Sequence, residues 1–302
     1  MSVDPLSNSQ PTTAEITETS FRDYFSLLKP RVMSLVVFIG FAGYWVAPMR
    51  DTLHPFLAFM GILSLAVGAG ASGAFNMWFE RDIDAVMNRT KNRPLPLQKM
   101  EPDNALGFSI FMSILAVTMM SISTNWVAAV VLAAASLFYI FVYTVWLKRI
   151  TPQNIVIGGA AGAFPPMVGY AMVTGTVSLE SLILFLIVFL WTPPHFWALA
   201  LYANEDYKRA NIPMMPVVAG EKNTKLQMLI YTVILWPVTL LPYVFGFASE
   251  IYAIAAGILG AVFIVAAIKV MLDDSYKSAK LMFGYSVFYL FALFLALMMT
   301  HI

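Results

Sequence analysis

The chain has 302 residues, of which 60% are hydrophobic and 12% are charged, and its formal net charge is +1. An average soluble domain carries about 25% charged residues. This composition, with a mean hydropathy of +0.75, therefore predicts a polytopic membrane protein and gives no electrostatic basis for binding nucleic acid. The absence of cysteine excludes disulfides, thiolate metal sites, cysteine nucleophiles and covalent heme attachment of the c type.

The N-terminal residues 1–25 are polar and lack the apolar core of a signal peptide. They contain four acidic residues, Asp4, Glu15, Glu18 and Asp23. This makes them too acidic for a typical mitochondrial transit peptide. We therefore expect a disordered cytoplasmic tail over 1–25, one polytopic membrane domain over 26–302, and a bacterial source.

Apolar stretches follow along the chain, each near the length of about 20 residues that a helix needs to cross the bilayer core. There are nine of them, at 32–49, 55–78, 105–123, 126–147, 154–174, 179–203, 226–247, 250–270 and 281–300. With these spans, every Lys and Arg except Arg50 falls on one side of the membrane. Because loops rich in Lys and Arg stay in the cytoplasm, we expect an all-α protein with nine transmembrane helices, a cytoplasmic N-terminus and a periplasmic C-terminus.

The end of the second predicted span carries a regular row of polar residues, in the sequence NMWFERDIDAVMNRTKNRPLP (76–96). Asn76, Glu80 and Asp84 are four residues apart, which places them on one face of a helix, about 6 Å apart per step. Two carboxylates and an amide in this arrangement suit Mg²⁺, which takes oxygen ligands and shares them with substrate phosphates. Asp82 would point elsewhere on a continuous helix, but it could join the row if the helix frays there. The alternative interpretation is a solvated helix end with ion pairs.

Cations follow this row and occur again after the fourth span. Arg89 and Arg93 lie in the loop, and Lys148 lies at the inner end of the fourth span. Positive charges beside a carboxylate-bound metal suit a diphosphate, whose charge needs neutralising from both sides. The fifth span then contains small residues that let helices or a flat ligand approach closely, namely Gly158, Gly159 and Gly162.

A second polar group lies on the sixth span and the loop after it, in WTPPHFWALALYANEDYKRANIPMMPVV (191–218). His195, Tyr202 and Asp206 have the spacing of one helical face, and two prolines before His195 are expected to kink the helix. An ionisable residue deep in a span is a candidate functional group, although a buried histidine bonded to a backbone carbonyl is the alternative. Tyr202 also fits an interfacial aromatic residue.

Charged residues surround Asp206 in this second group. Asp206 and Glu205 could complete the metal site. Lys208 and Arg209 could hold phosphate oxygens or serve only as topology signals.

The sequence resembles a known family. NMWFERDIDAVMNRTKNRPLP is similar to the first acidic motif of the UbiA superfamily of intramembrane prenyltransferases, and its D-x-D-x-x-M-x-R-T-x-x-R-P-L-P run resembles more closely the protoheme IX farnesyltransferases, or heme O synthases. Three further segments match that family, LLKPRVMSL (27–35), YTVWLKRITPQNIVIGGAAGAFPP (143–166) and TPPHFWALALYANEDYKRANIPMMPVV (192–218). The resemblance thus covers nearly the whole chain from about residue 25.

The resemblance implies a nine-helix bundle with a lateral opening and a polar cytoplasmic cap. It implies Mg²⁺-dependent transfer of a farnesyl group from farnesyl diphosphate to a vinyl group of heme B, which with added water gives heme O for heme-copper oxidases. It also implies a place in the bacterial inner membrane, and a heme A synthase or an oxidase assembly protein as a partner.

The resemblance also implies roles for individual residues. The metal-binding and catalytic set would be Asn76, Glu80, Asp84 and Asp206, with Glu80 standing where the wider superfamily usually has Asp. The diphosphate-binding set would be Arg89, Arg93, Lys148, Lys208 and Arg209. His195 and Tyr202 would contact heme, with His195 binding either the iron or a propionate.

Two other functions remain open from the sequence. One is prenyl transfer to an aromatic acceptor, such as a quinone precursor or a chlorin alcohol, in the same superfamily. The other is a heme or lipid transporter without catalysis, although transporters place charges at mid-membrane, whereas this chain keeps its acidic residues at one rim.

Overall fold

The computed structural model describes residues 19–273 and 275–301, and its regular elements there are helices apart from one isolated β-bridge between Ala248 and His301. The elements in chain order are α1 (Phe21–Leu27), α2 (Pro30–Trp45), η1 (Arg50–Thr52), α3 (Pro55–Phe79), α4 (Arg81–Val86), α5 (Pro102–Ser123), α6 (Trp126–Leu137), η2 (Phe138–Leu147), α7 (Asn154–Thr174), α8 (Leu179–Tyr202), α9 (Asn204–Arg209), α10 (Met215–Val218), α11 (Gly220–Val238), α12 (Leu241–Val244), α13 (Glu250–Leu272) and α14 (Lys277–Met299). The predicted all-α class is confirmed.

Among the described residues, eight helical segments are long and apolar enough to cross a membrane, with α6 and η2 forming one and α11 and α12 another. The number becomes nine if α1 and α2 are one span that is bent by 52° at the break between them. At this break Lys29 adopts the left-handed backbone conformation (φ 50°, ψ 53°), and Pro30 begins α2. The protein is therefore a multi-pass helical membrane protein, as the composition predicts.

The predicted tail over 1–25 is only partly covered by the structure. Residues 1–18 lie outside the described residues. Residues 21–25 belong to α1, which begins at a capping box formed by Ser20 and Asp23. The predicted tail and α1 thus overlap at residues 21–25, and the division at residue 25 stays a prediction.

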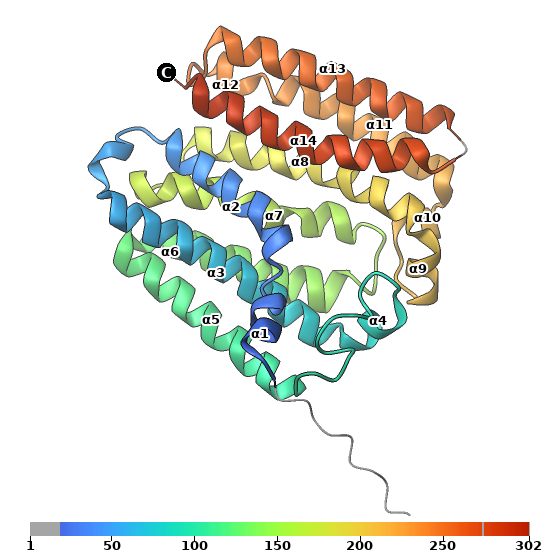
Figure 1. The fold of residues 1–302 in the computed structure, drawn as a ribbon. Helices are drawn as coiled ribbons and strands as arrows, with labels where there is room; N and C mark the ends of the chain where they lie inside the picture. The colour runs from blue at the N-terminus through green and yellow to red at the C-terminus, as the bar shows by residue number, and fades with distance from the viewer. Residues whose placement is uncertain (1–18, 274, 302) are drawn as a thin grey trace, which may run out of the picture.

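Helices α7 and α8 are the most buried of the candidate spans. Figure 1 shows α11, α13 and α14 along one side of the bundle and α3, α5 and α6 along the other, with α7 and α8 between them. One apolar core lies around Trp197 and Tyr289 on the first side, and another lies around Leu65 and Met120 on the second. Polar groups on α8 are therefore held between two packed layers.

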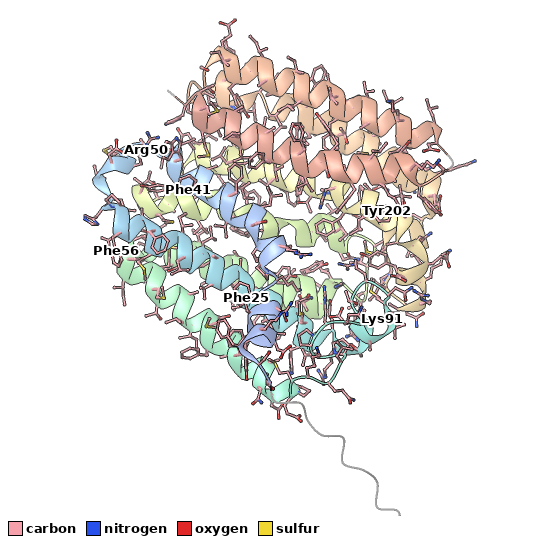
Figure 2. The ribbon with its side chains drawn as sticks, viewed as in Figure 1. Phe25, Phe41, Arg50, Phe56, Lys91 and Tyr202 are labelled. Carbon is pink, nitrogen blue, oxygen red and sulfur yellow. The ribbon has the colours of Figure 1, made fainter. Side chains whose placement is uncertain are left out.

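The two long loops that carry the predicted polar groups meet at one end of the bundle. Figure 1 shows α4 and α9 at this end, and Figure 2 shows Lys91 there and Arg50 at the opposite end. An apolar cluster packs the two loops together. Its members include Ile83, Met87, Ile155, Tyr207, Ile212 and Met214.

Candidate active site

Asn76, Glu80 and Asp84 form a buried polar row at the junction of α3 and α4. The backbone N–H of Glu80 donates to the carbonyl of Asn76 (3.0 Å), and the N–H of Asp84 donates to the carbonyl of Glu80 (2.8 Å). The four-residue spacing of a helix is thus kept across the junction. The exposed fractions of the three residues are only 3%, 2% and 2%, so the row is not a solvated helix end.

Each carboxylate of the row is paired with a cation, one from a distant part of the chain and one from the adjacent loop. Lys148, which follows η2, donates from Nζ to Oε2 of Glu80 at 2.5 Å. Arg93, in the loop after α4, donates from Nη1 to Oδ2 of Asp84 at 2.6 Å. Burying a charge is costly unless it is paired, so these cations stabilise the row. Two predicted diphosphate-binding residues therefore lie beside the predicted metal ligands.

Lys29 belongs to the same group, although the sequence alone presents it as a topology charge. Its Nζ donates to Oδ1 of Asn76 at 2.9 Å, and Nδ2 of Asn76 donates to Oγ1 of Thr144 at 3.3 Å. The Lys29 side chain passes close to Gly73 of α3, where an added Cβ would lie 3.4 Å from Cδ of Lys29. The sequence feature that could have pointed to Lys29 is its position before a proline, in LLKPRV. Thr144, on the π-helical η2, has no sequence feature that would have pointed to its contact with Asn76.

One oxygen of the row has no partner. Among the described residues, Oε1 of Glu80 is buried and makes no hydrogen bond, whereas buried polar atoms are normally paired. Together with the side-chain oxygens of Asn76 and Asp84, it makes an all-oxygen donor set of the kind that Mg²⁺ prefers. The residues present therefore fit a magnesium ion.

The second polar group is divided by a break in the helix. Helix α8 ends at Tyr202 and α9 begins at Asn204. The N–H of Ala203 donates to the carbonyl of Leu199 (3.0 Å), and the N–H of Tyr207 donates to the carbonyl of Ala203 (3.3 Å), so helical hydrogen bonding continues across this junction as it does between α3 and α4. The predicted shared face of His195, Tyr202 and Asp206 stays a prediction. The i, i+4 pattern misses this break because no proline or glycine marks it.

Asp206 links α9 to the loop after α4. Its Oδ1 accepts a hydrogen bond from Nδ2 of Asn88 at 3.3 Å and also pairs with Arg209. Over the residues that the structure describes, no three acidic or histidine side chains converge as a metal-binding group. Asp206 thus lies on α9 and forms no such group with Glu80 and Asp84 among the described residues, and its predicted role as a metal ligand stays a prediction.

The remaining predicted cations lie at the surface of this end of the bundle. Lys208 pairs with Glu205 at 2.9 Å on α9, and both side chains are substantially exposed. Arg89 is exposed in the loop after α4. These residues are positioned to meet an anion that arrives from the aqueous side.

Asp82 points away from the row, as expected from its place between Glu80 and Asp84. Its two carboxylate oxygens accept from the guanidinium of Arg149 at 2.8 and 3.0 Å. Burial alone would raise the pKa of Asp82, but the hydrogen bonds and charge of Arg149 hold that pKa below its ordinary value. Asp82 therefore belongs to an ion pair outside the row.

His195 faces α14. Its Nδ1 lies 2.7 Å from Oγ of Ser286, and its ring is stacked between Trp191 and Phe283, with centroids 4.3 and 4.7 Å away. The ring of Tyr202 contacts the edge of Phe283 at 6.1 Å. The two predicted heme contacts thus share a neighbour on α14, and Nδ1 of His195 bonds a hydroxyl instead of a backbone carbonyl.

The glycines of α7 divide into two kinds. An added Cβ would lie 2.2 Å from Tyr143 at Gly158 and 2.8 Å from Thr192 at Gly159. At Gly162, nothing lies within 4 Å of such an atom. The first two glycines therefore serve close helix packing, and the third leaves open space beside α7.

Comparison with known proteins decides the family. The sequence model of the UbiA prenyltransferase family matches residues 36–298. This protein belongs to the UbiA prenyltransferase family. The chain is 54% identical to "Protoheme IX farnesyltransferase 2" of Mesorhizobium japonicum, over 93% of this chain and 90% of the relative. It is also 54% identical to the protoheme IX farnesyltransferase of Rhizobium johnstonii, over 95% and 92%.

Solved UbiA structures share the fold. A digeranylgeranylglyceryl phosphate synthase superposes with a TM-score of 0.75 at 20% identity, over 92% of this chain and 97% of that one. A UbiA homologue from Archaeoglobus fulgidus bound to DMAPP and Mg²⁺ gives a TM-score of 0.65 at 16% identity, over 90% and 99%. The helical bundle is therefore of the UbiA type.

Proposed function

We propose that this protein transfers a farnesyl group from farnesyl diphosphate to a vinyl group of heme B, with addition of water, and so forms heme O. The observation that carries the reaction class is the buried row of Asn76, Glu80 and Asp84 with its three cations. The farnesyl donor and the heme acceptor come from relatives that are 54% identical over nearly their whole length.

The metal in this proposal is Mg²⁺, held by Asn76, Glu80 and Asp84 and joined by Asp206 from α9. The unpartnered Oε1 of Glu80 supports this assignment. When bound, the ion neutralises and orients the diphosphate of the substrate.

The cations of the row then act on the diphosphate itself. Arg93 and Lys148 turn from their carboxylates toward the phosphate oxygens, with Arg89, Lys208 and Arg209 closing the site from the aqueous side. They stabilise the negative charge that develops as the allylic C–O bond breaks. The allylic cation is attacked by the terminal vinyl carbon of heme, and water adds to the carbon next to the porphyrin. A proton and diphosphate are released.

The orientation in the membrane is part of the proposal. Nine spans, with α1 and α2 as one bent span, put the row at the cytoplasmic end, the N-terminus inside and the C-terminus in the periplasm. We place the protein in the bacterial inner membrane, because the relatives with this name are bacterial. A heme A synthase or an oxidase assembly protein would take up the product.

A product assay tests the proposal. Purified protein in lipid nanodiscs is incubated with heme B, farnesyl diphosphate and Mg²⁺, and the hemes are separated and analysed by mass spectrometry. We expect a new heme that is heavier by one farnesyl and one hydroxyl group and that is absent when the metal is chelated. Consumption of diphosphate with unchanged heme would favour an aromatic acceptor. Neither change, in folded protein, would favour a transporter.

A further inference from the structure

Ser286 of α14 engages two residues of α8 that lie one helical turn apart. Its backbone carbonyl accepts a hydrogen bond from Nε1 of Trp191 at 2.8 Å, and its hydroxyl oxygen lies 2.7 Å from Nδ1 of His195. Ser286 is fully buried. It takes no part in the metal row, so the proposed reaction so far gives it no role.

The contacts of Ser286 determine which nitrogen of His195 carries the proton. The Ser286 hydroxyl donates its single proton to the carbonyl of Phe283 at 2.6 Å, and a carbonyl can only accept. Oγ of Ser286 must then accept from His195, so both contacts are hydrogen bonds only when Nδ1 is protonated. A neutral imidazole in this tautomer carries its lone pair on Nε2.

The ring of His195 is enclosed by aromatic side chains, including Phe196, which meets it edge-on at 5.1 Å. Its two faces are covered by Trp191 and Phe283. Within the described residues Nε2 has no hydrogen-bond partner, and it is not among the fully buried atoms that lack one. Since His195 is 9% exposed, the edge that bears Nε2 retains accessible surface.

We propose that Ser286 is a positioning residue that fixes His195 in the Nδ1–H tautomer, and that Nε2 of His195 binds the iron of heme B as an axial ligand. This inference rests on the proposed function. In a neutral imidazole of this tautomer Nε2 offers a lone pair and no proton. Of the two heme contacts that the sequence leaves open, it therefore fits iron ligation and not a hydrogen bond to an ionised propionate. Histidines that bind metals characteristically donate their other ring N–H to a nearby acceptor.

Titration with ferric heme B tests the inference directly. The full-length protein in nanodiscs is titrated without farnesyl diphosphate, and the Soret band and the electron paramagnetic resonance spectrum are recorded. We expect the signals of an imidazole nitrogen on iron in the native protein and their loss in His195→Ala. Ser286→Ala should weaken heme affinity about 10- to 100-fold, the usual effect of removing such a partner, and Ser286→Thr should restore it.

Ser64→Ala is the matched control, because Ser64 is also fully buried and donates only to the carbonyl of Met60 in its own helix. Imidazole signals that persist in His195→Ala, or heme affinity and spectrum unchanged in Ser286→Ala, would overturn the inference. Native protein that makes farnesylated heme without imidazole ligation would overturn it and leave the proposed function standing. Imidazole ligation of the iron without any farnesylated product would support the inference and overturn the proposed function.

Discussion

Nζ of Lys148 lies 2.5 Å from Oε2 of Glu80, although the two residues are 68 positions apart in the chain. The pair ties the end of η2 to the end of α3 in the buried part of the site. The other carboxylate oxygen of Glu80 is buried without a partner among the described residues. Within the part of the chain that the structure describes, Lys148 therefore supplies the one cation that this carboxylate contacts, and both stability and diphosphate binding should depend on it.

Lys148→Met should destabilise the protein by about 3–5 kcal/mol, because it leaves the Glu80 carboxylate buried and unpaired. Glu80→Gln/Lys148→Met removes both charges and should recover much of this loss. Thermal unfolding of the two single variants and the double variant in the same nanodiscs measures the coupling. Strictly additive losses would show that the pair does not stabilise the fold.

Asp84→Asn should lower turnover by at least about 10²-fold, the scale of losing one electrostatic contact to a developing charge. The amide keeps an oxygen for Arg93, so the protein should remain folded. Asp82→Asn is the matched control, because Asp82 lies two residues away and pairs with Arg149 instead. Asp82→Asn should lower stability by only about 0–1 kcal/mol, because it removes a surface ion pair. Equal turnover in the two variants would remove Asp84 from the metal site.

Lys29→Gln should weaken the binding of inorganic diphosphate in the presence of Mg²⁺ by about 10- to 100-fold, the value of a hydrogen bond to a charged group. The reason is its position, because Nζ of Lys29 lies 2.9 Å from Asn76 in the predicted metal set. Isothermal titration of the protein in nanodiscs gives the affinity. Lys91→Gln serves for comparison, since Lys91 is exposed in the adjacent loop (Figure 2) and contacts Asn88. A larger loss at Lys91 would contradict the assignment.

The sequence predicts those parts of the molecule that depend on local pattern. The membrane helices follow from hydrophobic stretches of sufficient length. The row of Asn76, Glu80 and Asp84 follows from helical spacing, which survives the junction of α3 and α4. The position of Arg93 beside the row is predicted as well, because Arg93 lies only nine residues beyond its partner Asp84.

Contacts between distant segments are not predictable in this way. Lys29 reaches Asn76 over 47 positions, and His195 reaches Ser286 over 91. The first contact needs the bend at Lys29, where the left-handed backbone carries no glycine to signal it. The second needs the packing of α8 against α14, and a serine within an apolar span has no distinguishing periodicity. The break between α8 and α9 at Ala203 is likewise not marked by a proline or a glycine.

Gly43→Ala should destabilise the fold by about 1–3 kcal/mol, the usual cost of overpacking a well-packed core. Helix α2 crosses α7 so closely that an added Cβ at Gly43 would lie 2.0 Å from the backbone oxygen of Pro166, which cannot move as a side chain can. The same crossing is tight from the other side, since a Cβ at Gly169 would lie 1.9 Å from the backbone oxygen of Gly40.

Gly107→Ala makes the same chemical change on α5 where nothing lies within 4 Å of the added atom. It should leave stability unchanged or raise it by up to about 1 kcal/mol, because alanine favours helix more than glycine does. The opposite signs separate the steric effect at the crossing of α2 and α7 from the general effect of replacing glycine. Melting temperatures that rise equally in Gly43→Ala and Gly107→Ala would mean that α2 and α7 are not in this contact.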